Sequence, residues 1–170
     1  ICIMMPQDNN QASLWNISQP PAGAGIWPKM VGHLIGGGQS HYGFFPADYY
    51  CPHILLSGRG TVRCGDKEKA IKTGDMFCIW PERNIEYFED PDHPWVYDWI
   101  HLEGTGVRAL LEAWGFSDER LVIRPGEPDV VKRLFAQIIK AYRDKQPEDA
   151  FRIVAWLYEI AALCQPDLPS

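Results

Sequence analysis

Short strand-like stretches separated by turn residues dominate the chain between Met30 and Gly104, and they constrain its fold more than any other feature. Gly58, Gly65 and Gly74 stand between them, where tight turns need a positive φ. The stretches read MVGHLI, HYGFF, PHILLS, GTVRC, KEKAIKT, DMFCIW, IEYFE and WVYDWIHLE. About eight short strands are usual for a small antiparallel barrel or jelly roll, so we expect a mainly β fold.

After Gly104 the apolar period changes from two residues to about 3.6, which is typical of helices. We expect a short helix that ends at Gly115, a second that opens with Pro128 and a third that opens with Pro147. The expected organisation is an N-terminal arm over residues 1–29, a barrel over 30–104, and two or three helices over 105–165. The arm either packs on the domain surface or closes over a ligand.

The last helix carries more apolar surface than a single covering stripe needs. Its expected seam is Val154, Leu157, Tyr158 and Ala161, and the apolar surface is widened by Ala155, Trp156 and Ala162. The helices over 128–143 and 147–164 either cover the barrel only or also pair with those of a second copy. We favour the homodimer because the apolar surface exceeds one stripe.

Composition excludes several classes of function. The 170 residues are 46% hydrophobic and carry a formal net charge of −6, so this segment has no basic surface for nucleic acid. No apolar run approaches the roughly 20 residues of a membrane span. The five cysteines are scattered and form no CxxC pair, which favours a reducing, cytoplasmic setting over a disulfide framework or a zinc ribbon.

The sequence contains no motif for catalysis or for a metal. The five histidines form neither an HxH pair nor an HExxH motif. Ser57 lies in a turn rather than in a GxSxG elbow, and the glycines at 36–38 do not open a helix that would bind phosphate. We therefore expect no enzyme activity, no metal and no cofactor.

One stretch, WVYDWIHLEG at 95–104, places Trp95, Tyr97, Trp99 and His101 at alternate positions. In a strand, all four rings stand on one side of the sheet. They form either part of the core or a binding surface, and periodicity alone does not distinguish the two.

The run PHILLSGRGTVRCGDKEKAIKTGDMFCIWPERNIEYF, followed by WVYDWIHLEG, resembles the cupin-like ligand-binding and dimerisation domain of AraC-type transcription regulators. The resemblance rests on the turn SGRG at 57–60, on TGD at 73–75, on Pro81, and on WIHL at 99–102. By motif it covers residues 30–104, and by layout it extends over the helices.

The resemblance implies an organic effector bound without metal. Glu86 stands where the family and metal-binding cupins usually have a histidine, and the other cupin metal positions fall near Phe45, Ala47 and Cys51. The effector of such a domain is a small metabolite, with a sugar or polyol favoured. The alternative is a cupin enzyme, either a metal-dependent sugar isomerase or a dioxygenase.

The resemblance also implies site residues. In sugar-responsive members the ring matching Trp99 stacks on the sugar, and the residue matching Tyr97 lines the site. Glu86 and Phe88 share a face of the preceding strand, where they would supply an acceptor and a wall, and His41 lies near a polar contact from an early strand. Trp95 and His101 complete the candidate set, with core packing and an interior hydrogen bond as their other interpretations.

The family's DNA-reading part, a pair of helix-turn-helix units, would follow this domain and is absent from this chain. A first residue other than Met agrees with a segment of a longer protein. Contact with DNA is therefore expected only through a domain outside this sequence.

Overall fold

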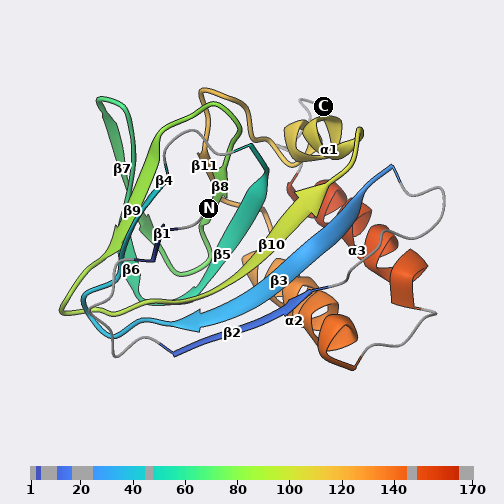
Figure 1. Cartoon of the computed structure of the whole chain (residues 1–170), viewed down its shortest axis with the longest axis horizontal. Helices are drawn as coiled ribbons and strands as arrows, with labels where there is room; N and C mark the ends of the chain where they lie inside the picture. Colours follow the sequence, from blue (N-terminus) through green and yellow to red (C-terminus); the bar gives the residue numbers. More distant parts are fainter. Residues whose placement is uncertain (1–2, 5–10, 17–24, 45–47, 145–148, 165–170) are drawn as a thin grey trace.

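Two antiparallel β-sheets face each other in the computed structural model, and three helices lie in the C-terminal part of the chain, with strand β11 between the first and the second (Figure 1). The structure describes residues 3–4, 11–16, 25–44, 48–144 and 149–164, so the expected opening of the third helix at Pro147 lies outside the described residues. The first sheet has the strand order β1-β4-β9-β6-β7, and the second has the order β11-β8-β5-β10-β3-β2. All the described pairings that join these strands are antiparallel.

The strand bounds follow the expected stretches closely. The first sheet contains β1 (Ile3–Met4), β4 (His41–Phe44), β6 (Arg59–Cys64), β7 (Lys67–Lys72) and β9 (Ile85–Glu89). The second contains β2 (Gln11–Asn16), β3 (Trp27–Ile35), β5 (Cys51–Ser57), β8 (Met76–Ile79), β10 (Val96–Glu103) and β11 (Val122–Ile123). The mainly β fold class is confirmed. In the described part of the chain no strand pair joins the two sheets, so these strands form a two-sheet jelly roll rather than one continuous barrel.

The described parts of the expected arm belong to the sheets. Strand β1 pairs with β4, strand β2 pairs with β3, and β3 itself starts at Trp27 rather than at Met30. The rest of the arm lies outside the described residues, and with it the expectation that the arm closes over a ligand.

Turn glycines have the conformations that the sequence predicts. Gly58, Gly65 and Gly74 have φ values of 77°, 59° and 87°, and Gly115, which follows the first helix, has 99°. At Gly58 a side chain is excluded for a second reason, since a Cβ would lie 2.3 Å from the carbonyl oxygen of Pro94. This turn therefore needs glycine both for its backbone and for its close contact with the β9–β10 connection.

The helices are α1 (Val107–Ala113), α2 (Pro128–Asp144) and α3 (Asp149–Cys164). Helix α2 contacts β2, β3 and β10, and it covers the face of the second sheet that points away from the first (Figure 1). The buried hydroxyl of Tyr142 donates to the carbonyl oxygen of Pro28, at the start of β3. Helix α3 packs on α1 and α2, and the indole of Trp114 donates to the Leu157 carbonyl oxygen at 3.1 Å.

Helix α3 buries part of the seam that the sequence predicts for a partner. Leu157 is fully buried and Ala161 nearly so, both inside this chain. The apolar residues that α3 exposes are Phe151, Ala155, Tyr158 and Ala162.

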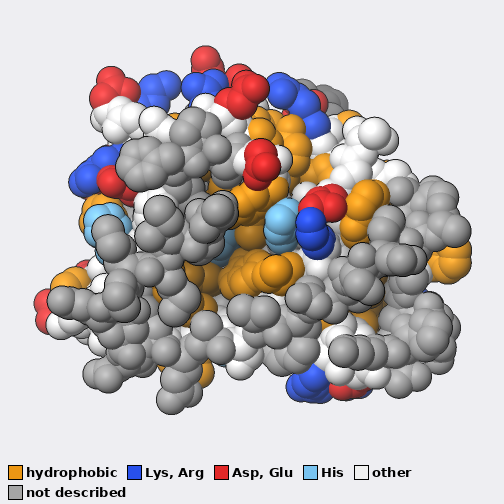
Figure 2. All heavy atoms as spheres, in the orientation of Figure 1, with side chains coloured by type: hydrophobic (Ala, Val, Ile, Leu, Met, Phe, Trp, Pro, Cys, Tyr) orange, Lys and Arg blue, Asp and Glu red, His pale blue; other side chains and the backbone are white. Residues whose placement is uncertain are grey.

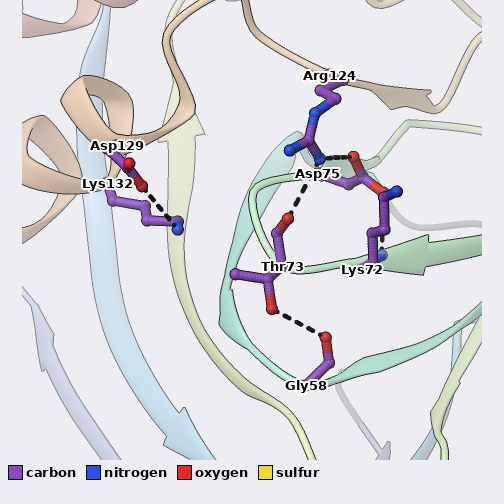
Figure 3. A network of polar contacts seen from close by, with 7 residues as sticks. All are labelled: Gly58, Lys72, Thr73, Asp75, Arg124, Asp129 and Lys132. Atoms are coloured by element: carbon purple, nitrogen blue, oxygen red, sulfur yellow. Dashed lines mark hydrogen bonds and ion pairs between the residues drawn. The ribbon is translucent and has the colours of Figure 1, made fainter.

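A polar network joins the loop after β11 to the β7–β8 turn (Figure 3). The Arg124 guanidinium donates to Asp75 Oδ1 at 2.7 Å and to the Thr73 carbonyl oxygen at 3.2 Å. The Thr73 hydroxyl donates to the Gly58 carbonyl oxygen at 3.2 Å, and Asp75 Oδ2 accepts from the Lys72 backbone N–H at 2.9 Å. These contacts attach the segment that leads into α2 to the tip of the sandwich.

Candidate functional site

The inner face of β10 carries Tyr97, Trp99 and His101, and Trp95, the fourth ring that the sequence places on this side, directly precedes the strand. Trp99 pairs in register with Gly32 of β3 and His53 of β5, and Tyr97 pairs with Leu34 and Leu55, so these side chains point between the two sheets. Burial decreases along the strand. Trp95 and Tyr97 are buried, whereas Trp99 and His101 are partly exposed.

A cluster of rings fills the middle of this interior. The Tyr97 ring lies 5.2 Å from that of His53 and 6.2 Å from that of Tyr87, measured between centroids. His53 stacks on Phe77 at 4.3 Å, and Phe77 lies 4.7 Å from Tyr87. The cluster joins β10 and β5 of one sheet to β9 of the other, so it belongs to the core, with Tyr97 as a member.

His53 is a neutral polar group within these rings. Its side chain is buried, and its Nδ1 lies 2.9 Å from the Cys51 carbonyl oxygen. Burial lowers its pKa to about 3, and the hydrogen bond to Cys51 offsets this only in part. If Nδ1 is the protonated nitrogen that this contact requires, Nε2 is left as an acceptor that faces the rings.

Trp99 lies against the backbone of β3. A Cβ built on Gly32 would stand 2.3 to 2.6 Å from three atoms of the indole, so no larger residue fits there without moving Trp99. Glycine within a strand often marks such a close approach. The partly exposed indole is therefore packed closely against β3.

His101 lies two residues beyond Trp99 and has an unpartnered nitrogen. Its Nε2 is buried and forms no hydrogen bond within the described part of the chain. The ring stacks on Tyr49 with centroids 4.4 Å apart, and Nε2 lies 3.7 Å from Glu103 Oε1, which is held by Lys29 at 2.7 Å. Burial lowers the pKa of His101, and the nearby Glu103 carboxylate opposes that shift. A neutral imidazole with a free Nε2 can donate to or accept from a ligand, depending on its tautomer.

Near the start of β10, opposite the partly exposed end at Trp99 and His101, lies the buried carboxylate of Glu89. Glu89 Oε1 accepts from the backbone N–H and the hydroxyl of Ser40, both at 2.6 Å, and Oε2 accepts from the Trp95 backbone N–H at 3.1 Å. The indole nitrogen of Trp95 is buried and has no hydrogen-bond partner among the described residues. Strand parity in IEYFE groups Glu89 with Ile85 and Tyr87, but parity alone does not show that this face is the inner one.

The structure separates the candidate residues from the sequence into two groups. Glu86 and Phe88 do share one face of β9, as expected, but it is the outer face, and His41 of β4 lies there too. Glu86 forms an ion pair with Arg63 at 3.0 Å, and the Arg63 guanidinium lies 5.3 Å from the centre of the Phe88 ring. The expectation that Glu86 and Phe88 face the same interior as Tyr97 is therefore corrected.

Residues that the sequence did not single out replace them at the inner wall. Tyr87, between Glu86 and Phe88, points inward and stacks on Tyr42 of β4 with centroids 5.2 Å apart. His53 and Phe77 complete the wall. Their signal was parity within IEYFE, PHILLS and DMFCIW, but a period of two does not say which of two faces is the inner one.

The described residues contain no cluster of metal-ligating side chains. No group of three or more His, Cys, Asp or Glu side chains that could hold a metal lies there. Of the positions compared with cupin metal ligands, Cys51 is buried in β5 and Glu86 is on the outer face, while Phe45 and Ala47 lie outside the described residues.

Two facing antiparallel sheets, a ring-lined interior and C-terminal helices define a cupin-like domain. The sequence profile of the AraC-like ligand-binding domain matches residues 28–161. The chain belongs to this family.

Individual relatives are more distant. The lactose operon transcription activator of Staphylococcus xylosus is 21% identical over 120 residues, which cover 69% of this chain and 43% of that protein. The crystal structure of the AraC-like transcriptional activator CuxR superposes with a TM-score of 0.57 at 10% identity, covering 94% of this chain and 64% of that one. A Cupin 2 conserved barrel domain protein from Salinispora arenicola CNS-205 gives 0.41 at 15% identity, with coverages of 57% and 79%. The chain thus spans less than two thirds of the length of each of these two activators.

Among the described helices, none is long and apolar enough to cross a bilayer.

Proposed function

We propose that this chain is the effector-binding and dimerising part of a transcription regulator, and that its effector is a small, uncharged sugar or polyol held between the two sheets. The observation that carries the proposal is the pairing of Trp99 with His101 at the partly exposed end of β10. There a partly exposed indole lies two residues away, on the same face of β10, from an imidazole nitrogen that has no hydrogen-bond partner in the described chain.

The chemistry of these two groups suits a sugar. The C–H face of a pyranose packs on a flat ring, and its hydroxyls need a small number of polar partners at the edge. Trp99 supplies the ring and His101 the polar atom, while Tyr97 forms the floor beneath them. The buried His53 and the partly exposed His101 are neutral near pH 7, and Lys29 is paired with Glu103, so these groups offer an incoming ligand no unpaired charge.

Two comparisons support the sensing role. Membership of a ligand-binding family favours an effector, and the relative named a lactose operon transcription activator favours a sugar as its chemical class. On this proposal the effector prefers one arrangement of the domain pair and so changes how attached DNA-reading domains are spaced.

A thermal-shift screen of pentoses, hexoses, uronates and polyols tests the proposal. A neutral sugar should raise the melting temperature, and Trp99→Ala should reduce its affinity by about two- to tenfold, since stacking on one ring contributes about 0.5–1.5 kcal/mol. Phe88→Ala is the matched control, because it removes a partly exposed ring from the outer face. A thermal shift that survives Trp99→Ala and disappears with Phe88→Ala would place the ligand on the outer face of the first sheet and contradict the proposal.

Metal analysis tests the metal-free part. Protein purified without chelators should contain no stoichiometric transition metal. Stoichiometric iron, manganese or zinc would favour the cupin-enzyme alternative instead.

A further inference from the structure

A cleft of about 580 Å³ opens where the free edges of the two sheets approach each other. One wall is the β6–β7 hairpin, and the other is the segment 118–122, which leads into β11; the turn 82–84 closes one end. Strands β7 and β11 are the last strands of their respective sheets. Charged side chains of both signs gather along the top of the face drawn in Figure 2, over β7 and the loop before β11. This volume falls in the range of small-molecule sites, and the lining includes none of Trp99, His101 and Tyr97.

The floor of the cleft is apolar. Val62 of β6 and Leu121 and Val122 of the opposite wall are buried and line it. Val62 pairs in register with Tyr87, so the floor adjoins the ring cluster without being part of the candidate site around Trp99. The apolar part of a ligand bound in the cleft would pack on these three side chains.

Two lysines overhang this floor. Lys67 pairs in register with Cys64, and Lys69 with Val62, so both stand on the inner side of β7, the side that also holds the buried Ile71. Residues two apart on a strand are about 7 Å apart, which lets two flexible ammonium groups reach one carboxylate. Within the described chain neither lysine forms an ion pair or a side-chain hydrogen bond.

Five acidic residues line the cleft too, but two of them are paired with arginines. Glu68 points to the outer side and binds Arg63 at 2.9 Å, and Asp118 binds Arg83 at 3.1 Å. The remaining acids lie on turns and bends at the ends of the cleft: Asp66, Glu82 and Glu119. The positive charge therefore lies over the apolar floor, and the negative charge lies at the ends.

We propose that this cleft is a second ligand site, distinct from the interior around Trp99, and that it takes a small organic monoanion with an apolar body. The carboxylate would bridge the ammonium groups of Lys67 and Lys69, and the body would pack on Val62, Leu121 and Val122. The acids at the ends select against ligands with several negative charges.

Three probes with one hydrocarbon body test the sign of the charge: hexanoate, 1-hexanol and hexylamine. In NMR titrations of the isotope-labelled protein, hexanoate should shift the amide signals of Val62, Leu121 and Val122. Its dissociation constant should be at least about tenfold lower than that of either other probe, which corresponds to about 1.4 kcal/mol. Hexylamine binding as tightly as hexanoate, or no hexanoate binding up to tens of millimolar, would overturn the proposal.

Variants separate a ligand site from an edge-protecting role, since lysines on edge strands also discourage strand pairing between molecules. The double variant Lys67→Ala/Lys69→Ala should weaken hexanoate binding at least about tenfold. Lys72→Ala, which removes an exposed lysine from the other face of the same strand, should leave it unchanged. Equal losses in both variants would contradict the site. Hexanoate binding should also survive Trp99→Ala, so this site and the proposed sugar site succeed or fail separately.

Discussion

His53 is a titratable side chain whose protonation is governed by burial among aromatic rings. Its folded pKa of about 3 lies below the ordinary value of 6.5, so the unfolded chain binds a proton between these values and the folded chain does not. The contribution to stability is complete above pH 6.5 and is lost as the pH falls toward 3. Between pH 6 and 4, we expect this residue alone to lower the free energy of unfolding by about 1.4 kcal/mol per pH unit.

Urea unfolding at several pH values checks this expectation in the wild type and in His53→Phe. The variant should have a shallower pH dependence by about one proton. Asp98 works in the opposite direction, because burial raises the pKa of its carboxyl and favours the folded state as the pH falls, but its contribution cancels in the comparison. His41→Phe, at an exposed position, is the control. An unchanged slope in His53→Phe would mean that His53 becomes protonated in the folded protein.

Gly32 is a second residue whose role is set by a neighbouring ring. Gly32→Ala places a methyl group against the Trp99 indole, so the indole or the β3 backbone must move. We expect a loss of about 1–3 kcal/mol in the free energy of unfolding, the usual cost of overpacking. Fluorescence of Trp99, compared with Trp99→Phe as a blank, should report the displaced indole. Gly43→Ala, where a Cβ would meet only the Glu86 side chain at 3.8 Å, should be nearly neutral.

At the scale of strands, the sequence predicts well where most of the strands occur, but it predicts poorly which face of a strand points into the interior. Each of the eight expected stretches contains or overlaps a strand, because turn glycines and alternating side chains leave few other conformations. Glu86 and Phe88 were correctly expected to share a face. The sequence could not show which face is the inner one. An apolar ring such as Phe88 can remain on the outer face because the Arg63 guanidinium lies over it and also pairs with the Glu86 carboxylate. Such pairing comes from another strand and leaves no trace in the period of β9.

Strands β1, β2 and β11 were missed for a related reason. They have two to six residues and each is the last strand at one end of its sheet, so pairing with a neighbour defines them rather than their own pattern. The helices were easier to predict. Pro128 opens α2 as expected, because proline fits the first helical turn, where its missing N–H is not needed.

Helix α2 is fixed to β3 by one buried hydrogen bond as well as by apolar packing. The Tyr142 hydroxyl donates to the Pro28 carbonyl oxygen, and burial raises the pKa of the phenol, so it stays protonated over the accessible pH range. Tyr142→Phe should lower the free energy of unfolding by about 1–3 kcal/mol, since a buried carbonyl loses its donor. Tyr158→Phe, on the exposed side of α3, should have no measurable effect on the unfolding of the monomer. Equal stability of Tyr142→Phe and the wild type in urea would show that water replaces the donor.

At the scale of the whole molecule, β3 and β10 are shared by two layers. Their inner side chains line the candidate effector site, whereas their outer surface carries α2. Helix α2 in turn contacts α3. A ligand that moves β10 therefore has a continuous packed path to the helices, which is the connection that a regulator needs between its effector and a partner subunit.

The exposed stripe of α3 is the surface that we expect to meet that partner. Phe151, Ala155, Tyr158 and Ala162 follow spacings of four, three and four residues, as in the seam of a coiled coil. Phe151 is 78% exposed and Tyr158 is 56% exposed, which is unusual for large apolar side chains of a chain that stands alone. Pairing with the same helix of a second copy would bury both.

Tyr158→Glu tests this pairing, because it places a charge in the middle of the stripe and leaves the buried side of α3 untouched. We expect the dimer dissociation constant to rise about 30-fold or more, the loss of a central aromatic contact of about 2 kcal/mol. Gln137→Glu adds the same charge to an exposed position of α2 and should leave the constant unchanged. Sedimentation velocity over a dilution series measures both. A wild-type protein that stays monomeric at high micromolar concentration would contradict the pairing, and an equally weakened dimer in both variants would move the interface away from the stripe.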